Sequence, residues 1–234
     1  MSLVCSREDC EYRILIKGQD RSTLSMPLGS LPDLSENDTC NRSHISRDST
    51  TIEDIWHPKS FDCLKLIRVK QITATTEVTC SSQGLFISSK PTATVIAKIA
   101  RFQWEISRIS QETRIYKSLE NTPIGPRFLG HVHEHGRVIG ILLEKLEDRE
   151  AAIENLSACM SVLKRLHDIG ILHGDVNRYN FIIQNGTARL IDYEESQIFH
   201  GDASSMQAEM DSLNDQLNEC TGRGGGFRFI EAQT

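Results

Sequence analysis

Runs of alternating apolar residues predict most of the strands in this chain. Alternation over residues 12–17, with a weaker pattern over 23–31, predicts a hairpin near the N-terminus. Later runs of the same kind predict strands at 62–70, 72–80, 84–88, 93–100, 126–132 and 138–144. Because several short strands precede the first helical stretch, we expect an antiparallel sheet.

Apolar residues at helical spacing predict helices over 102–120, 151–167 and 204–218. Asn121-Thr122-Pro123 ends the first of them. The apolar stripes are Trp104, Ile106, Ile109, Ile115, Tyr116 and Leu119 in the first helix, Ile153, Leu156, Met160, Leu163 and Leu166 in the second, and Met206, Met210, Leu213 and Leu217 in the third. Strands followed by helices in this way predict an α+β fold.

Changes in composition along the chain predict its domain organisation. Residues 33–52 are rich in Ser, Asp, Asn and Thr and have almost no apolar residues, which predicts a flexible linker. We therefore expect an N-terminal extension over 1–59 that holds the hairpin and this linker. The chain becomes globular again after this linker and ends in a glycine-rich, flexible tail.

The composition of the whole chain excludes several classes of protein. The 234 residues carry a formal net charge of -6, which argues against a general nucleic-acid or membrane-surface role. No apolar run approaches the ~18 residues of a membrane span, and acidic residues near the N-terminus are atypical of a signal peptide. The seven cysteines are an odd number without a CxxC pair, so a disulfide framework or a zinc site is not expected. We expect a cytoplasmic or nuclear protein that is not secreted.

The most specific chemical signal is a polar loop between apolar runs, in the string ILHGDVNRYNFII at residues 171–183. Asp175 and Asn180 are five residues apart, and Asp192 follows twelve residues later. Phosphoryl transfer uses such a set, because it depends on positioned anions and metal ions more than on a strong nucleophile. Asp175 would orient an acceptor hydroxyl and take its proton, while Asn180 and Asp192 would offer hard oxygen ligands to Mg²⁺. The alternative is an Asx-rich turn between a helix and a hairpin.

Lys98 interrupts the most apolar strand, in the string TVIAKIA. It matches a lysine that contacts nucleotide phosphates, or it is an edge-strand lysine whose ammonium group reaches water. The following helix offers Glu105 and Glu112 as partners for this lysine. Glu105 lies close to the first turn, whereas Glu112 lies in mid-helix beside the apolar stripe, so we select Glu112. Otherwise Glu112 is an ordinary solvated charge.

Three histidines, His131, His133 and His135, alternate along the predicted hairpin and suggest a metal site. No carboxylate partner stands out, and the segment bends at Gly136. We therefore favour a solvated hairpin tip over a metal site.

On these motifs the chain resembles the protein-kinase-like phosphotransferases, and it is most similar to compact, atypical members found mainly in filamentous fungi. The resemblance covers roughly residues 60–220 and rests on the strings TVIAKIARFQWEI, QETRIYKSLE, IGPRFLGHV, ILHGDVNRYNFII and LIDYEES. It implies a bilobal kinase-like fold with ATP bound between the lobes. The antiparallel β N-lobe would span 60–146, and a reduced, mainly helical C-lobe would span 147–234.

The resemblance also implies a role for each charged residue of the motifs. Lys98 would contact the phosphates of ATP and pair with Glu112. Asp175 would be the catalytic base, and Asn180 and Asp192 would hold Mg²⁺. The segment 143–146 would be the hinge, in which the backbone of Glu144 and of Leu146 contacts adenine.

The chain departs from the regulated protein kinases in four respects. No G-x-G-x-x-G precedes Lys98, so residues 72–77 or 81–84 would have to cover the phosphates. His-Gly-Asp replaces His-Arg-Asp, which removes the arginine that meets a phosphorylated activation loop. Asp192-Tyr-Glu replaces D-F-G. Only 42 residues follow Asp192, too few for the platform on which a peptide substrate docks.

The expected function is an ATP- and Mg²⁺-dependent kinase that transfers a phosphoryl group to a hydroxyl of a protein or of a small molecule. One alternative is a pseudokinase, a nucleotide-binding or scaffolding module with a protein partner and no turnover. Another is a structural domain without a ligand. The expected partners are ATP and a hydroxyl acceptor, with neither nucleic acid nor a membrane.

Overall fold

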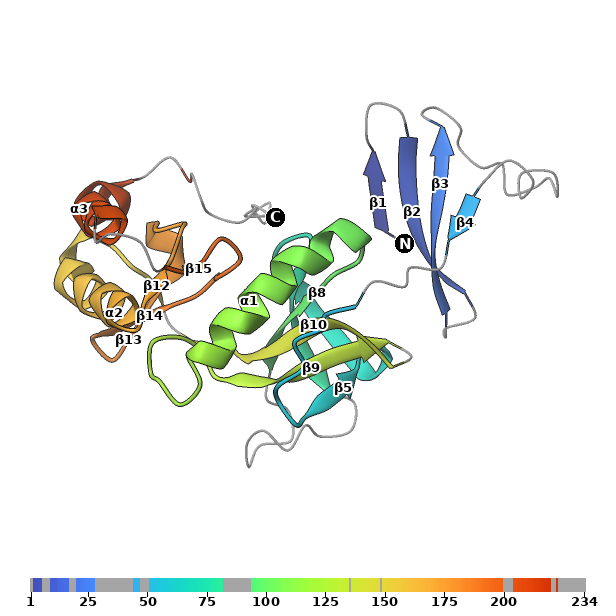
Figure 1. Ribbon diagram of the computed structural model, residues 1–234, viewed down its shortest axis with the longest axis horizontal. Coiled ribbons are helices and arrows are strands. Elements are labelled where there is room, and N and C mark those ends of the chain that lie inside the picture. The colour runs from blue at the N-terminus through green and yellow to red at the C-terminus, as the bar shows by residue number, and fades with distance from the viewer. Residues whose placement is uncertain are drawn as a thin grey trace, which may run out of the picture.

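The computed structural model describes residues 2–5, 9–16, 20–27, 44–46, 51–81, 94–134, 136–147, 149–199, 204–219 and 222. These residues form a small N-terminal sheet, a larger central sheet with one helix, and a third group that holds two more helices (Figure 1).

The N-terminal sheet is antiparallel and consists of β1 (Ser2–Cys5), β2 (Asp9–Ile16), β3 (Asp20–Pro27) and β4 (His44–Ser46), in that order. The predicted hairpin is confirmed as the pair β2 and β3. The predicted linker over 33–52 is wrong in part, because it contains β4 and because Ile52 is fully buried and donates its N–H to the Val138 carbonyl. Residues 33–43 and 47–50 lie outside the described residues.

The central sheet has six strands, in the order β5 (Ser60–Asp62), β9 (Phe128–Glu134), β10 (Arg137–Glu144), β8 (Val95–Ile99), β7 (Thr76–Ser81) and β6 (Leu66–Gln71). The prediction of an antiparallel sheet is right for every pair except β5 and β9, which are parallel. The strand predicted over 62–70 begins late, because the Asp62 side chain accepts the Leu64 N–H and caps a 3₁₀ turn there. The strand predicted over 84–88 lies outside the described residues.

Helix α1 (Ile106–Ser118) packs against β10 of the central sheet (Figure 1). A 3₁₀ turn (Gln103–Glu105) precedes the helix, and the Glu105 carboxylate accepts two backbone N–H groups at its start. The predicted stripe is buried except for Trp104, which is 49% exposed. The prediction fails for Trp104 because it lies in the 3₁₀ turn, where its ring stacks on Phe102 at 4.6 Å.

The third group contains α2 (Leu156–Asp168), α3 (Ser204–Asn218), a sheet of β11 (Arg149–Glu150), β13 (Phe181–Gln184) and β14 (Thr187–Leu190), and the pair β12 (Ile171–Leu172) and β15 (Gln197–Ile198). Helix α2 packs on β14 and on α3. The stripe predicted for α2 is wrong at Ile153 and Met160, which are exposed. Since the helix begins only after a 3₁₀ turn over 153–155, Cys159 and Val162 take these places in the core.

A continuous apolar core joins the central sheet to the third group. It includes Leu142 from β10, Ile115 from α1, Leu163 from α2 and Leu213 from α3, all fully buried. The predicted α+β composition is therefore confirmed. Among the described residues, no helix combines the length and the apolar character that crossing a membrane requires.

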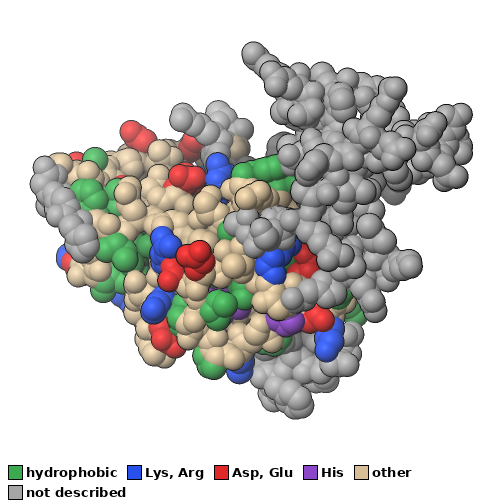
Figure 2. Space-filling view, turned by 45° about the vertical axis from the view of Figure 1, so that its right-hand side comes forward, with side chains coloured by type: hydrophobic (Ala, Val, Ile, Leu, Met, Phe, Trp, Pro, Cys, Tyr) green, Lys and Arg blue, Asp and Glu red, His purple; other side chains and the backbone are tan. Residues whose placement is uncertain are grey.

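Acidic and basic side chains alternate over the face drawn in Figure 2. Green apolar side chains are scattered between them rather than gathered into one area. The described residues of this face therefore form no broad basic patch of the kind that attracts a phosphate backbone.

Candidate active site

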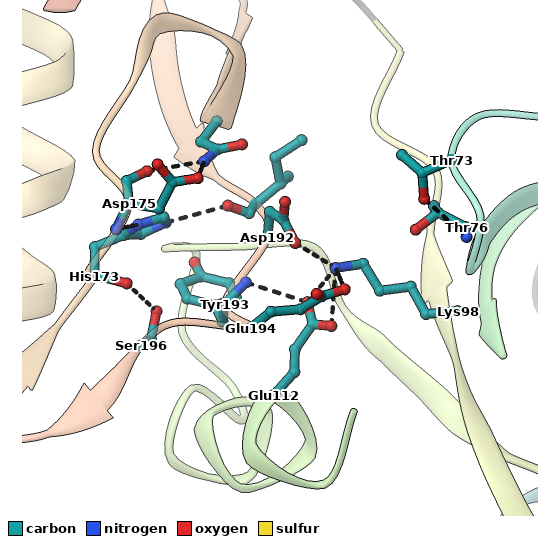
Figure 3. Close-up of polar contacts among 12 residues, drawn as sticks. Thr73, Thr76, Lys98, Glu112, His173, Asp175, Asp192, Tyr193, Glu194 and Ser196 are labelled. Atoms are coloured by element: carbon teal, nitrogen blue, oxygen red, sulfur yellow. Dashed lines mark hydrogen bonds and ion pairs between the residues drawn. The ribbon is translucent and has the colours of Figure 1, made fainter. Parts of the chain in front are cut away.

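Lys98 lies in the middle of the central sheet, which excludes the edge-strand alternative. Its strand β8 pairs with β10 on one side and with β7 on the other, and the residue is only 5% exposed. Its Nζ lies 2.9 Å from Glu112, 2.6 Å from Asp192 and 3.3 Å from Glu194 (Figure 3). An ammonium group has three N–H donors, so each has a carboxylate partner here.

The charges of this cluster shift one another's pKa values. Burial disfavours the charged form of Lys98, but the surrounding carboxylates raise its pKa above the ordinary value, so the ammonium persists. Burial raises the pKa of Glu112 to about 7 against the attraction of Lys98, and the negative charge of Asp192 adds to the rise. Burial would also raise the pKa of Asp192, but Lys98 holds it below its usual range.

The segment after β14 places Asp192 and Tyr193 beside this cluster. The backbone N–H of Tyr193 donates to the Glu112 carboxylate at 3.2 Å, and its buried hydroxyl donates to the Leu190 carbonyl at 3.0 Å. Asp192 has a φ of 66°, a left-handed conformation that is uncommon for a residue with a side chain. Strained conformations of this kind concentrate at functional sites.

Two amide side chains hold the carboxylate of Asp175. Asn177 and Asn180 each donate an Nδ2–H to Asp175 Oδ2, at 3.1 and 3.0 Å. Asn177 Oδ1 accepts the Tyr179 N–H at 2.9 Å, so both ends of this amide are engaged. The amide nitrogen of Asn180 also donates to the Asp175 carbonyl at 2.8 Å, which leaves its Oδ1 as the atom that can meet a cation.

His173 connects this loop to the segment that carries Asp192 (Figure 3). Its Nδ1 accepts the Asp175 N–H at 3.4 Å, and its Nε2 lies 3.1 Å from the Ile191 carbonyl. Burial lowers the pKa of His173, so the ring is neutral and its proton sits on Nε2, facing that carbonyl. Ile191 in turn donates its N–H to the Asn180 carbonyl at 2.9 Å. The three oxygen-bearing residues of the motif, Asp175, Asn180 and Asp192, therefore belong to one connected network.

Gly174 explains why this loop has glycine between its histidine and its aspartate. Its φ is 84°, and an added Cβ would lie 2.3 Å from the Glu195 carbonyl oxygen. No side chain fits there without movement of the backbone. The absence of an arginine at this position thus has a local steric cause.

Glu209 on α3 holds the same loop from the other side. Its carboxylate accepts the N–H groups of Gly174 at 2.6 Å and His173 at 3.2 Å, and it lies 2.8 Å from His167 Nε2. Burial would raise the pKa of Glu209, but the hydrogen bond from His167 and the two backbone donors lower it. One carboxylate therefore ties α2, α3 and the loop together.

The turn 72–75 between β6 and β7 lies next to Lys98, because Thr76 pairs with Lys98 across β7 and β8. Directly opposed residues share a face of the sheet. The first two N–H groups of the turn donate to the Thr76 carbonyl, and the Thr76 N–H donates to Thr73 Oγ1 at 3.1 Å (Figure 3). These donors are engaged within the turn. Of the two predicted phosphate covers, the other, at 81–84, lies mostly outside the described residues.

The two predicted hinge residues lie near the end of β10 and do not contact the Lys98 cluster. Glu144 pairs with Val95 across β10 and β8. Its N–H donates to the Arg127 carbonyl at 2.9 Å, and its carboxylate accepts from Arg189 at 3.2 Å. Leu146 follows the strand and is half-buried. The Glu144 N–H is therefore engaged within the protein.

The expectation of a solvated hairpin tip is wrong for His131. Its side chain is fully buried in the sheet, where Nε2 accepts the His57 backbone N–H at 3.3 Å. The aromatic rings of Trp56 and Phe128 surround it. His133 is half-buried, and His135 lies outside the described residues.

Asp192 and Asn180 carry oxygen atoms that could meet a hard divalent cation, whereas Glu112 and Glu194 already face the Lys98 ammonium together with Asp192. Oxygen atoms of Glu112, Asp192 and Glu194 lie within 4.8 Å of one another, and the cluster holds more carboxylates than cations. Asn180 adds an amide oxygen that its own hydrogen bonds leave available. Carboxylate and amide oxygens are the ligands that Mg²⁺ prefers.

The motif search missed four residues of the site, and two of them act through contacts that cross large distances in the sequence. Glu194 and Asn177 stood beside motif residues and could have been noticed as extra polar groups. Glu209 and Ser196 gave no local signal: Ser196 is buried and donates its hydroxyl to the His173 carbonyl at 2.6 Å. Only the packing of α3 and β15 against the loop reveals their contacts.

No protein-family model matches this sequence, and a comparison with curated proteins finds no similar one. The resemblance to kinase-like phosphotransferases therefore rests on the sequence motifs alone.

Proposed function

We propose that this protein is an ATP- and Mg²⁺-dependent phosphotransferase with a compact, bilobal kinase-like fold. One observation carries the proposal: Lys98 from the sheet and Glu112 from α1 meet Asp192, whose neighbour Ile191 is hydrogen-bonded to the loop of Asp175 and Asn180. A lysine, a helix glutamate, a loop aspartate and asparagine and a metal-binding aspartate are the parts that kinases use.

The order of the elements supports the kinase-like fold. The strand of Lys98 leads into α1, the next hairpin leads into α2, and α2 leads into the loop and the hairpin β13–β14 that precedes Asp192. The central sheet with α1 then corresponds to the N-lobe, and the group around α2 and α3 to a reduced C-lobe.

Each polar residue has a role in the proposed reaction. Lys98 binds phosphate oxygens, and Asn180 and Asp192 hold the metal. When bound, Mg²⁺ supplies positive charge that offsets the phosphates. Because Asn177 and Asn180 fix one oxygen of Asp175, its other oxygen can orient the acceptor hydroxyl and take its proton.

The adenine ring has a candidate platform on the Lys98 face of the sheet. Ile96 lies two residues before Lys98 and therefore points to the same face. It pairs with Val78 on β7 and with Leu143 on β10. Leu143 is the first residue of the segment that we propose as the hinge, so Ile96 and Val78 lie between Lys98 and that segment.

A second candidate function is nucleotide binding without turnover. Its support is that the N–H groups at the start of the turn 72–75 are engaged within the turn. A cover of this kind offers fewer backbone donors to phosphates than a glycine-rich loop does. A measurement of ATP turnover distinguishes the two candidate functions, because only the phosphotransferase would consume ATP.

The first experiment measures thermal unfolding with and without Mg²⁺–ATP. A ligand that binds only the folded state adds about 2.7 kcal/mol of stability at 100 times its Kd. We expect a clear rise in Tm for the wild type and for Asp175→Asn, and a much smaller rise for Asp192→Asn. Asp215→Asn, an exposed aspartate on α3, is the charge-matched control.

The second experiment measures ADP release with water and with a panel of hydroxyl-bearing metabolites and proteins as acceptors. We expect Asp175→Asn to lower turnover by about 100-fold or more, because general bases contribute that much. An unchanged Tm with Mg²⁺–ATP would overturn the proposal. Binding without turnover for any acceptor would favour the second candidate.

A further inference from the structure

Glu194 is the least firmly held of the three partners of Lys98. Its carboxylate lies 3.3 Å from the ammonium, against 2.9 Å for Glu112 and 2.6 Å for Asp192. Within the described part of the chain, Glu194 makes no other hydrogen bond or ion pair, and its side chain is 21% exposed. Glu112, by contrast, is fully buried and also accepts the Tyr193 N–H.

A phosphate oxygen that binds Lys98 has to replace one of these carboxylates, because the three donors of the ammonium are already matched. Glu112 cannot leave without abandoning the Tyr193 N–H in the protein interior. Glu194 can swing to solvent at small cost, since it is partly exposed and Lys98 is its single partner among the described residues. The Asp192 side chain is more exposed, at 44%, but its contact with Lys98 is the shortest of the three, at 2.6 Å, and it is the proposed metal ligand. Figure 3 shows its carboxylate beside the Lys98 ammonium, from the segment that follows Asp192.

We propose that Glu194 is a specificity-determining residue that makes this site accept metal-complexed ATP and reject free ATP. The inference rests on the proposed nucleotide site. The Glu194 carboxylate occupies the place of a phosphate oxygen on Lys98 and competes with the nucleotide for it.

Charge explains why the metal decides the outcome. Free ATP brings several negative charges to a cluster in which three carboxylates already face one ammonium. Like charges at such distances repel strongly inside a protein. A nucleotide that carries Mg²⁺ has less negative charge, so the carboxylates of the cluster would repel it less.

Isothermal titration calorimetry with ATP tests this inference, in EDTA and in excess Mg²⁺, on the wild type, Glu194→Gln and Glu194→Ala. We expect both variants to bind metal-free ATP about tenfold more tightly than the wild type, a change of about 1.4 kcal/mol. The alanine variant is included because a glutamine carbonyl can still accept a hydrogen bond from Lys98. The ratio of the metal-free Kd to the Mg²⁺ Kd should fall in both.

Glu195→Gln is the matched control, because it removes the same charge from the next, exposed residue. Its metal-free Kd should stay within about twofold of the wild type at ~0.15 M salt, where exposed charges are screened. If the wild type binds Mg²⁺–ATP but the Glu194 variants gain no more metal-free affinity than Glu195→Gln, the inference is overturned and the proposed function stands. If none of the four proteins binds ATP under either condition, both are overturned.

Discussion

His131 shows how a single buried residue can make the stability of this protein depend on pH. The side chain is fully buried, and burial together with the nearby His57 lowers its pKa to about 4 from an ordinary value of 6.5. Between these pH values the unfolded chain binds a proton that the folded protein does not. The contribution of the neutral His131 ring to the free energy of unfolding is therefore fully present above pH 6.5, and it is lost as the pH falls toward 4.

We expect His131→Gln to remove a large part of this pH dependence. A glutamine carbonyl can accept the His57 N–H without titrating. The free energy of unfolding in urea, compared at pH 7 and pH 4.5, should fall by about 2 kcal/mol less in the variant than in the wild type, at 1.36 kcal/mol per pKa unit. His133→Gln, two residues along the same strand, is the control. An equal loss in wild type and His131→Gln would contradict the assignment of a neutral ring.

At the scale of elements, α3 acts on the site through Glu209. A glutamine at this position keeps the shape but replaces one of the two acceptor oxygens with a donor. We expect Glu209→Gln to lower stability by about 1–3 kcal/mol, because a backbone N–H of the loop loses its partner. Amide hydrogen exchange at His173 and Gly174 should accelerate more than exchange in β7 and β8, whose amides report only the loss of global stability.

Asp215→Asn on the exposed side of α3 is the control for this experiment. It removes the same charge from the same helix without touching the loop. If both variants left exchange at Gly174 unaltered, the hydrogen bonds of Glu209 would not stabilise the loop. The loop would then be held to α3 by apolar packing alone.

The sequence predicted elements well where a local pattern decides them. Helix α3 has the predicted bounds, and the hairpins β2–β3 and β9–β10 form where alternation indicated. The predicted starts of α1 and α2 were too early, because a 3₁₀ turn precedes each helix. Trp104 and Ile153 lie in these turns and are exposed, although helical spacing predicted that they would be buried. Apolar periodicity does not distinguish the two kinds of turn.

The site was predictable only as far as its residues share a motif. Spacing related Asp175 to Asn180 and Asp192, and the helical position of Glu112 related it to Lys98. Glu194 and Glu209 act through contacts that depend on how distant elements pack, and sequence spacing carries no information on such contacts.

For the whole molecule, the pairing of Lys98 with carboxylates connects the central sheet to the third group of elements. Glu112 and Lys98 belong to the sheet and its helix, whereas Asp192 and Glu194 follow β14. A hydrogen bond from Gln111 to the Ser196 carbonyl, at 2.7 Å, makes a further connection. Loss of the ammonium should therefore weaken the whole fold as well as a nucleotide site.

We expect Lys98→Met to destabilise the protein by about 3–5 kcal/mol, because it leaves the buried Glu112 without its counter-charge. Lys98→Met/Glu112→Gln should recover part of this loss, with a coupling energy of about 1–3 kcal/mol. Lys164→Met removes a lysine from an exposed pair with Asp168 and should cost about 0.5 kcal/mol. Urea unfolding of the single and double variants measures the coupling. Additive losses would mean that Lys98 and Glu112 contribute to stability independently.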